Sequence, residues 1–109
     1  MITLLERIKM HKIMLATAAL ALIISSSAMA GDVAAGKTKS MMCVACHGMK
    51  GISAIGIYPN LAGQKEQYLV KQIKAFRSGD RIDPSMKPMV ASLTDTDVDN
   101  LAAYFSSLK

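Results

Sequence analysis

Both cysteines of the chain and one of its two histidines lie within five consecutive positions, Cys43-Val44-Ala45-Cys46-His47. The pattern C-x-x-C-H is the signature of covalent haem attachment. Two thiols on one helical turn reach the two vinyl groups along one edge of a porphyrin and form thioethers, and the next residue then lies beneath the iron. We therefore expect one covalent haem c, anchored by Cys43 and Cys46, with His47 as an iron ligand.

Three other kinds of site use paired cysteines. A thioredoxin-like redox pair belongs to a βαβ setting, and no such pattern surrounds the motif. A disulfide is possible in an exported protein, but a two-residue spacer closes a loop too small to stabilise the chain much. A structural zinc ion needs four ligands, whereas residues 31–109 offer three cysteine and histidine side chains, two of them adjacent. Haem attachment accounts for every position of the motif.

Residues 1–30 have the three parts of an export signal. A basic segment precedes the apolar run Ile13–Ile24, and Ala28 and Ala30 provide small residues at an A-x-A-like cleavage site. The apolar run is too short to span a bilayer, which requires about 20 apolar residues. We therefore expect cleavage after Ala30, a periplasmic location, no stable membrane insertion and a mature domain over residues 31–109.

Translation starts at Met1 or at Met10, since the segment from Met10 onwards also forms a complete signal. The mature chain carries ten Lys and Arg against seven Asp and Glu, a net charge of +3, and it has five aromatic residues and no Trp. Side chains alone would then form a small hydrophobic core, and a domain with such a core usually requires a disulfide, a metal or a cofactor for stability. The mature chain has no phosphate-binding loop, no second histidine for acid–base chemistry and no basic stripe with aromatics for nucleic acid.

Three helices are predicted for the mature chain. Asp32 is a suitable N-cap for a short helix that leads into the cysteines. Leu69, Ile73 and Phe76 have amphipathic helical spacing, and Gly79 is a plausible stop for that helix. Thr94 is a suitable N-cap for a last helix, whose apolar residues form one stripe: Val98, Leu101, Ala102, Phe105 and Leu108.

Two long segments connect these helices. Residues 48–63 hold four glycines and a proline, which is typical of a loop. Residues 80–92 contain two prolines, and we expect a loop that crosses to the last helix. Long ordered loops in a small chain suggest that they surround something. The expected fold class is all-α, with three main helices and long loops around one haem.

The chain resembles the class I cytochromes c from about residue 32 to its end. The resemblance lies in the blocks CVACHG, YPNLAGQKEQYLVKQIKAFRSGDR, MKPM and LTDTDVDNLAAYFSSL, in that order. It is most similar to the short bacterial periplasmic monohaem carriers and to one half of the tandem dihaem "c-four" cytochromes. The resemblance implies a small helical shell around one haem. It also implies that the first and last helices come into close contact at Gly36, opposite Tyr104 and Phe105.

The resemblance also implies a role for each site residue. His47 would be the proximal iron ligand, and the backbone carbonyl of Pro59 would accept the hydrogen bond from its other ring nitrogen. A thioether from the loop before the last helix would be the distal ligand. In the most similar cytochromes the ligand stands eight residues before the cap of the last helix, which selects Met86; Met89 is the runner-up.

The expected function is transfer of single electrons in the periplasm by one haem c with His/Met ligation, as a monomeric carrier and not an enzyme. The expected partners are donor and acceptor oxidoreductases, such as a dehydrogenase or a terminal oxidase of a respiratory chain, and not nucleic acid. The alternative is a haem subunit that accepts electrons within a periplasmic dehydrogenase complex. If neither Met86 nor Met89 binds iron, the open position would bind small ligands or turn over peroxide.

Overall fold

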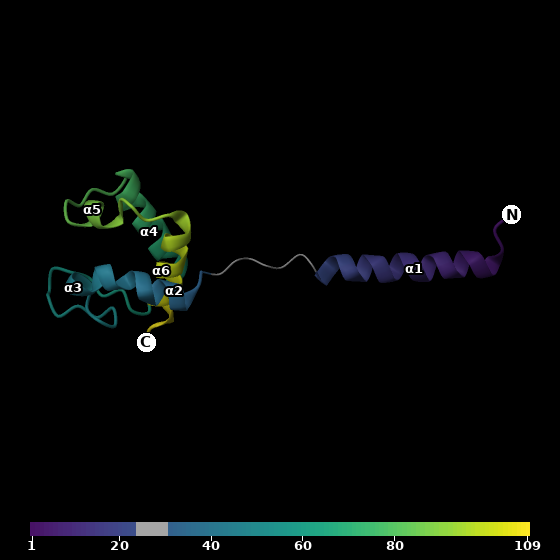
Figure 1. Cartoon of the computed structure of the whole chain (residues 1–109), viewed down its shortest axis with the longest axis horizontal. Coiled ribbons are helices and arrows are strands. Elements are labelled where there is room, and N and C mark those ends of the chain that lie inside the picture. The colour runs from purple at the N-terminus through teal and green to yellow at the C-terminus, as the bar shows by residue number, and fades with distance from the viewer. Residues whose placement is uncertain (24–30) are drawn as a thin grey trace.

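The computed structural model describes residues 1–23 and 31–109, and these residues form helices and no strand (Figure 1). This confirms the predicted all-α class. The helices are α1 (Leu4–Ile23), α2 (Val33–Lys39), the 3₁₀ helix η1 (Ser40–Cys43), α3 (Val44–His47), α4 (Glu66–Ser78), α5 (Met86–Val90) and α6 (Asp95–Ser107).

The predicted export signal is only partly described. Helix α1 covers most of its basic and apolar segments, and it lies apart from the cluster of the other helices in Figure 1. The cleavage site predicted at Ala28 and Ala30 lies outside the described residues. Within the described parts of the chain, no helix has both the length and the hydropathy of a membrane span.

The segment that carries the cysteines is a nearly continuous helical path. The Asp32 side chain accepts a hydrogen bond from the backbone N–H of Ala35, so Asp32 caps α2 as predicted. The path tightens into η1 and continues as α3, which ends at Gly48 with φ of 86°. That backbone conformation favours glycine, because other residues are strained there. The turn at Gly48 directs the chain away from the helix directly after His47.

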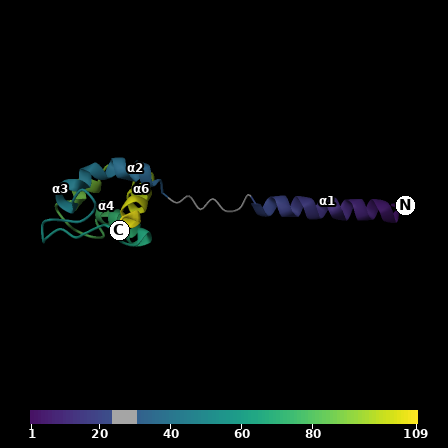
Figure 2. The same ribbon diagram turned by 90° about the horizontal axis from the view of Figure 1, so that it is seen from below.

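Helix α2 crosses α6 at very close range (Figure 2). A Cβ atom at Gly36 would lie 1.9 Å from the carbonyl oxygen of Asn100 and 2.8 Å from Cβ of Tyr104. The Asn100 side chain also accepts a hydrogen bond of 2.8 Å from the backbone N–H of Asp32. The close contact predicted at Gly36 is therefore confirmed, and it fixes the segment that leads to the cysteines against the last helix.

Helix α6 provides most of the buried core. Thr94 caps it through a capping box with Asp97. The predicted stripe is buried except for its last member, Leu108, which is partly buried. Helix α4 ends at Gly79 as predicted, and its buried residues Leu69 and Phe76 join the same core.

The Arg77 side chain joins α4 to the start of α6. Its Nη1 donates to the carbonyl oxygen of Leu93 at 2.8 Å, and its Nη2 donates to the Asp95 carboxylate. The hydrogen bond from Arg77 to Asp95 is the main reason why the pKa of Asp95 lies below its usual value. The charges of Lys74 and Arg77 also lower this pKa.

The segment between α4 and α6 differs from the prediction of a plain loop. It contains α5, with Met86 as its first residue and Pro88 as its third. Proline is tolerated in the first turn of a helix, where its missing N–H would have had no helical partner. The two prolines therefore restrict this segment without excluding a helix.

Candidate functional site

One cavity of about 480 Å³ lies between the segment that carries the cysteines and the segment that carries α5. Its walls come from α3, from the loop after it, and from α4, α5 and α6. The lining is mainly apolar, as in the core residues Leu69, Phe76, Val90, Leu93, Leu101 and Phe105. The long loops therefore surround a space that side chains do not fill.

His47 lies in this lining with only 6% of its surface exposed. Its Nδ1 is 2.8 Å from the backbone carbonyl oxygen of Pro59. Because a carbonyl oxygen only accepts hydrogen bonds, Nδ1 carries the hydrogen and donates it. The other ring nitrogen, Nε2, then keeps its lone pair for a metal. The ring of Tyr58 lies next to the imidazole, with centroids 6.3 Å apart.

Cys43 and Cys46 both line the cavity, are half-buried and are not joined in a disulfide. Burial raises the pKa of the Cys43 thiol to about 11, with a further contribution from Cys46. A reactive redox cysteine has a lowered pKa instead. The Cys43 thiol therefore lacks the environment of a reactive redox cysteine.

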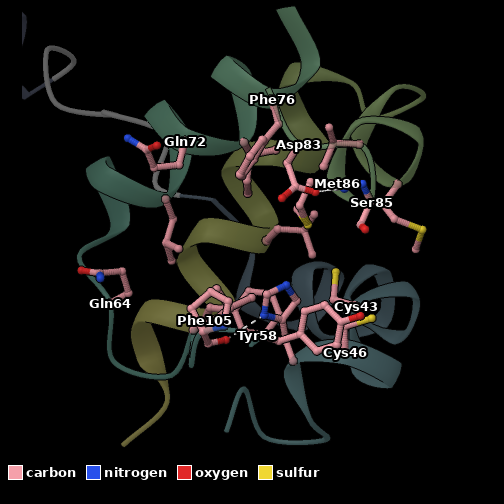
Figure 3. Close-up of a pocket in the computed structure, with 18 of the residues that line it drawn as sticks. Cys43, Cys46, Tyr58, Gln64, Gln72, Phe76, Asp83, Ser85, Met86 and Phe105 are labelled. Carbon is pink, nitrogen blue, oxygen red and sulfur yellow. Dashed lines mark hydrogen bonds between the residues drawn. The ribbon is translucent and has the colours of Figure 1, made fainter. Parts of the chain in front are cut away.

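Two methionines enter the cavity from α5. Met86 is half-buried and packs against the hydrophobic core, whereas Met89 is 41% exposed. Figure 3 shows Met86 across the cavity from Cys43 and Cys46.

Tyr68 of α4 also lines the cavity but remains 47% exposed, so it contributes little to the core.

Two charged residues of the lining were not predicted from the sequence. Arg81 lies above the ring of Phe76, with 4.4 Å from its guanidinium carbon to the ring centroid, and it donates a 2.8 Å hydrogen bond to Gln72 Oε1. Asp83 accepts hydrogen bonds from the backbone next to Met86. An aspartate just before a turn is a recognisable cap signal. The position of Arg81 has no comparable local signal.

Comparison with known proteins places this arrangement in a family. The family model for cytochrome c matches residues 33–109. The chain belongs to the cytochrome c family. Its single C-x-x-C-H motif implies one covalent haem c, and cytochromes c of this kind are electron carriers and not catalysts.

Individual relatives agree with this assignment. Cytochrome c-554(548) of Halomonas halodenitrificans is 49% identical over 81 residues, which cover 72% of this chain and 98% of the relative. The crystal structure of reduced recombinant cytochrome c4 from Pseudomonas stutzeri is 42% identical, with a TM-score of 0.70 over 73% of this chain and 47% of that chain. A protein of Thiomonas intermedia named thiosulfate dehydrogenase electron acceptor is 42% identical, over 70% of this chain and 36% of the relative. The chain thus spans less than half of the latter two proteins.

The cavity fits a haem on its own chemistry. Two thiols, one imidazole and the methionine thioethers of α5 line an apolar space. These are the kinds of group that attach haem and bind its iron. At its rim the Arg81 guanidinium has no carboxylate within ion-pair distance among the described residues. Haem carries two propionate carboxylates, so an unpaired cation at the rim also suits it.

Proposed function

We propose that this cytochrome is a periplasmic carrier of single electrons, exported by residues 1–30 and active as residues 31–109. In this proposal Cys43 and Cys46 would attach the haem, and His47 and Met86 would bind its iron. The observation that carries the proposal is one apolar cavity with the imidazole of His47 and the thioether of Met86 in its lining. When bound, the haem supplies a reversible one-electron couple.

The contact between His47 and Pro59 supports a proximal role. The backbone carbonyl fixes the tautomer and the ring orientation, and it makes Nε2 more basic. A buried imidazole held in this way keeps the same position whether the iron is ferrous or ferric. The mainly apolar lining would limit the access of water to a bound haem.

The difference in burial between the two methionines supports Met86 as the distal ligand. A thioether that already packs against the core, as that of Met86 does, would lose little conformational entropy on binding iron, whereas Met89 is 41% exposed. Thioether ligation also raises the reduction potential, which suits a carrier. Met89 would then contact the haem as a flexible apolar side chain.

The rim of the cavity suits the propionates. In a haem they lie on the edge opposite the vinyl groups, so the attachment cysteines direct them to the far end of the cavity. Gln64 and Gln72 lie at the end away from Cys46 (Figure 3), and Gln72 accepts the hydrogen bond from Arg81. We expect Arg81 to pair with a propionate there.

Replacing each methionine in turn tests the ligand assignment. Met86→Ala should remove the iron–sulfur charge-transfer band of the ferric protein, and Met89→Ala should retain it. Retention in the Met86 variant would refute Met86 as the ligand. A pyridine haemochrome spectrum on periplasmic protein checks covalent attachment, and Cys43→Ala with Cys46→Ala should lose it.

A second candidate function is an electron-accepting subunit or partner of a dehydrogenase. It is favoured by the Thiomonas intermedia relative, which is named as the electron acceptor of thiosulfate dehydrogenase. Reduction of the purified ferric protein by a thiosulfate dehydrogenase, followed by absorbance, tests this directly. Co-purification of a second chain would favour a permanent subunit, and a monodisperse monomer would favour the diffusing carrier.

A further inference from the structure

The backbone at the start of α5 is held by one side chain. Oδ1 of Asp83 accepts hydrogen bonds from the backbone N–H groups of Ser85, at 2.8 Å, and of Met86, at 2.9 Å. The Asp83 carbonyl oxygen accepts a third bond, of 3.1 Å, from the N–H of Lys87. Three consecutive amides therefore converge on a single residue.

Helix α5 depends on such a cap. It has five residues, far fewer than a helix needs to be stable by itself. Pro88 contributes no N–H to it, and its formal N-cap Ser85 makes no side-chain capping bond. With so few helical bonds available, the carboxylate of Asp83 is the strongest local restraint on the first turn, because hydrogen bonds to an ionised acceptor are stronger than neutral ones.

The first residue of that turn is Met86. Its own amide is one of the two that Asp83 holds, and its side chain points into the same cavity whose lining includes Asp83. We infer that Asp83 is a positioning residue for Met86: its carboxylate fixes the backbone at the start of α5 so that the thioether faces the haem iron. This inference rests on the proposed role of Met86 as distal ligand.

The neighbouring acidic residue provides a control. Asp80 lies three positions earlier in the same loop, is exposed, and makes no side-chain hydrogen bond or ion pair with the described residues. Asp80→Ala therefore removes the same charge from the same loop without touching the start of α5. Asp83→Asn removes the charge of Asp83 but keeps an oxygen that can accept both amide bonds.

The experiment measures the charge-transfer band of the ferric protein and its affinity for added imidazole, which competes with the thioether for iron. Asp83→Ala should weaken the band and tighten imidazole binding by roughly tenfold or more, since two hydrogen bonds to a charged acceptor are lost. Asp83→Asn should tighten imidazole binding by less than Asp83→Ala does, because its acceptor oxygen remains but no longer carries a charge. Asp80→Ala should match the wild type.

Equal behaviour of Asp83→Ala and the wild type would overturn the inference, and so would equal weakening in Asp83→Ala and Asp83→Asn. Far-UV circular dichroism identifies a variant that fails to fold. If Asp83→Ala fails to fold, a weaker band in Asp83→Asn than in Asp80→Ala supports the inference, and equal bands in these two variants overturn it. Failure of the proposed function has a different signature: the band survives in Met86→Ala, whatever the Asp83 variants do.

Discussion

Gly36→Ala tests the crossing of α2 and α6 that holds the haem-attachment segment. The added Cβ would meet the Asn100 carbonyl oxygen at 1.9 Å and the Cβ of Tyr104 at 2.8 Å. Both neighbours are fixed parts of α6, so no side-chain rotation relieves the contact. Relief requires the two helices to separate by about 1 Å, because an ordinary carbon–oxygen contact is above 3 Å.

The expected cost follows from two opposing effects. Overpacking a well-packed contact costs about 1–3 kcal/mol, and the upper part of this range applies because backbone must move. Alanine in place of glycine returns about 0.5–1 kcal/mol through its better helix propensity. The net destabilisation is about 2 kcal/mol, which in a domain of this size lowers Tm by roughly 8–16 °C.

Thermal unfolding of the ferric holoprotein by far-UV circular dichroism measures this effect. Gly56→Ala is the matched control, since nothing lies within 4 Å of its added Cβ, and its Tm should be unchanged or slightly higher. We also expect a lower yield of covalent haem from Gly36→Ala, because α2 leads directly into the cysteines. A Tm for Gly36→Ala equal to that of the Gly56 control would refute the close helix contact.

Two further substitutions test side chains on the α4 side of the cavity. Arg77→Ala should lower the free energy of unfolding by about 1 kcal/mol through loss of the bond to the Leu93 carbonyl, measured by urea denaturation. The hydrogen bond from Arg77 also lowers the pKa of Asp95 in the folded state. The ionised carboxylate therefore stabilises the fold above a pH of about 4, and this stabilisation is lost as the pH falls through the pKa of Asp95 in the folded state. The difference in free energy of unfolding between the wild type and Arg77→Ala should therefore become smaller as the pH is lowered from about 5. A difference that stays constant with pH would contradict this account. Arg81→Ala should lower the reduction potential, because a nearby cation disfavours the more positive ferric state; Arg81→Lys should shift it less, and equal potentials in all three proteins would exclude a contact between Arg81 and a propionate.

The features that sequence predicted well are those with local causes. Asp32, Gly79 and Thr94 end or begin helices through bonds to residues within a few positions, so their types and spacing were sufficient. Gly36 was predicted through resemblance and is explained by a contact with Asn100, which is distant in the chain.

One feature that sequence missed has a local cause: two prolines favoured a plain loop over residues 80–92, but Asp83 caps the helix that forms there. The other missed features depend on tertiary position. Arg81 gained its place from the ring of Phe76 and the amide of Gln72, and no neighbouring residue signals either contact. The cavity itself is also a tertiary property, because its lining comes from segments across the whole domain.

The arrangement of helices relates the positions of the two proposed iron ligands to one element of the fold. His47 belongs to the path that α2 begins, and Met86 begins α5, which packs against α4. Helix α6 contacts both α2 and α4, so it is the element that sets the separation of the two ligands. The contacts at Gly36 and Arg77 help to fix that separation. A loosened contact at either place should therefore change ligation of the iron by the proposed ligands, even though neither residue lines the cavity.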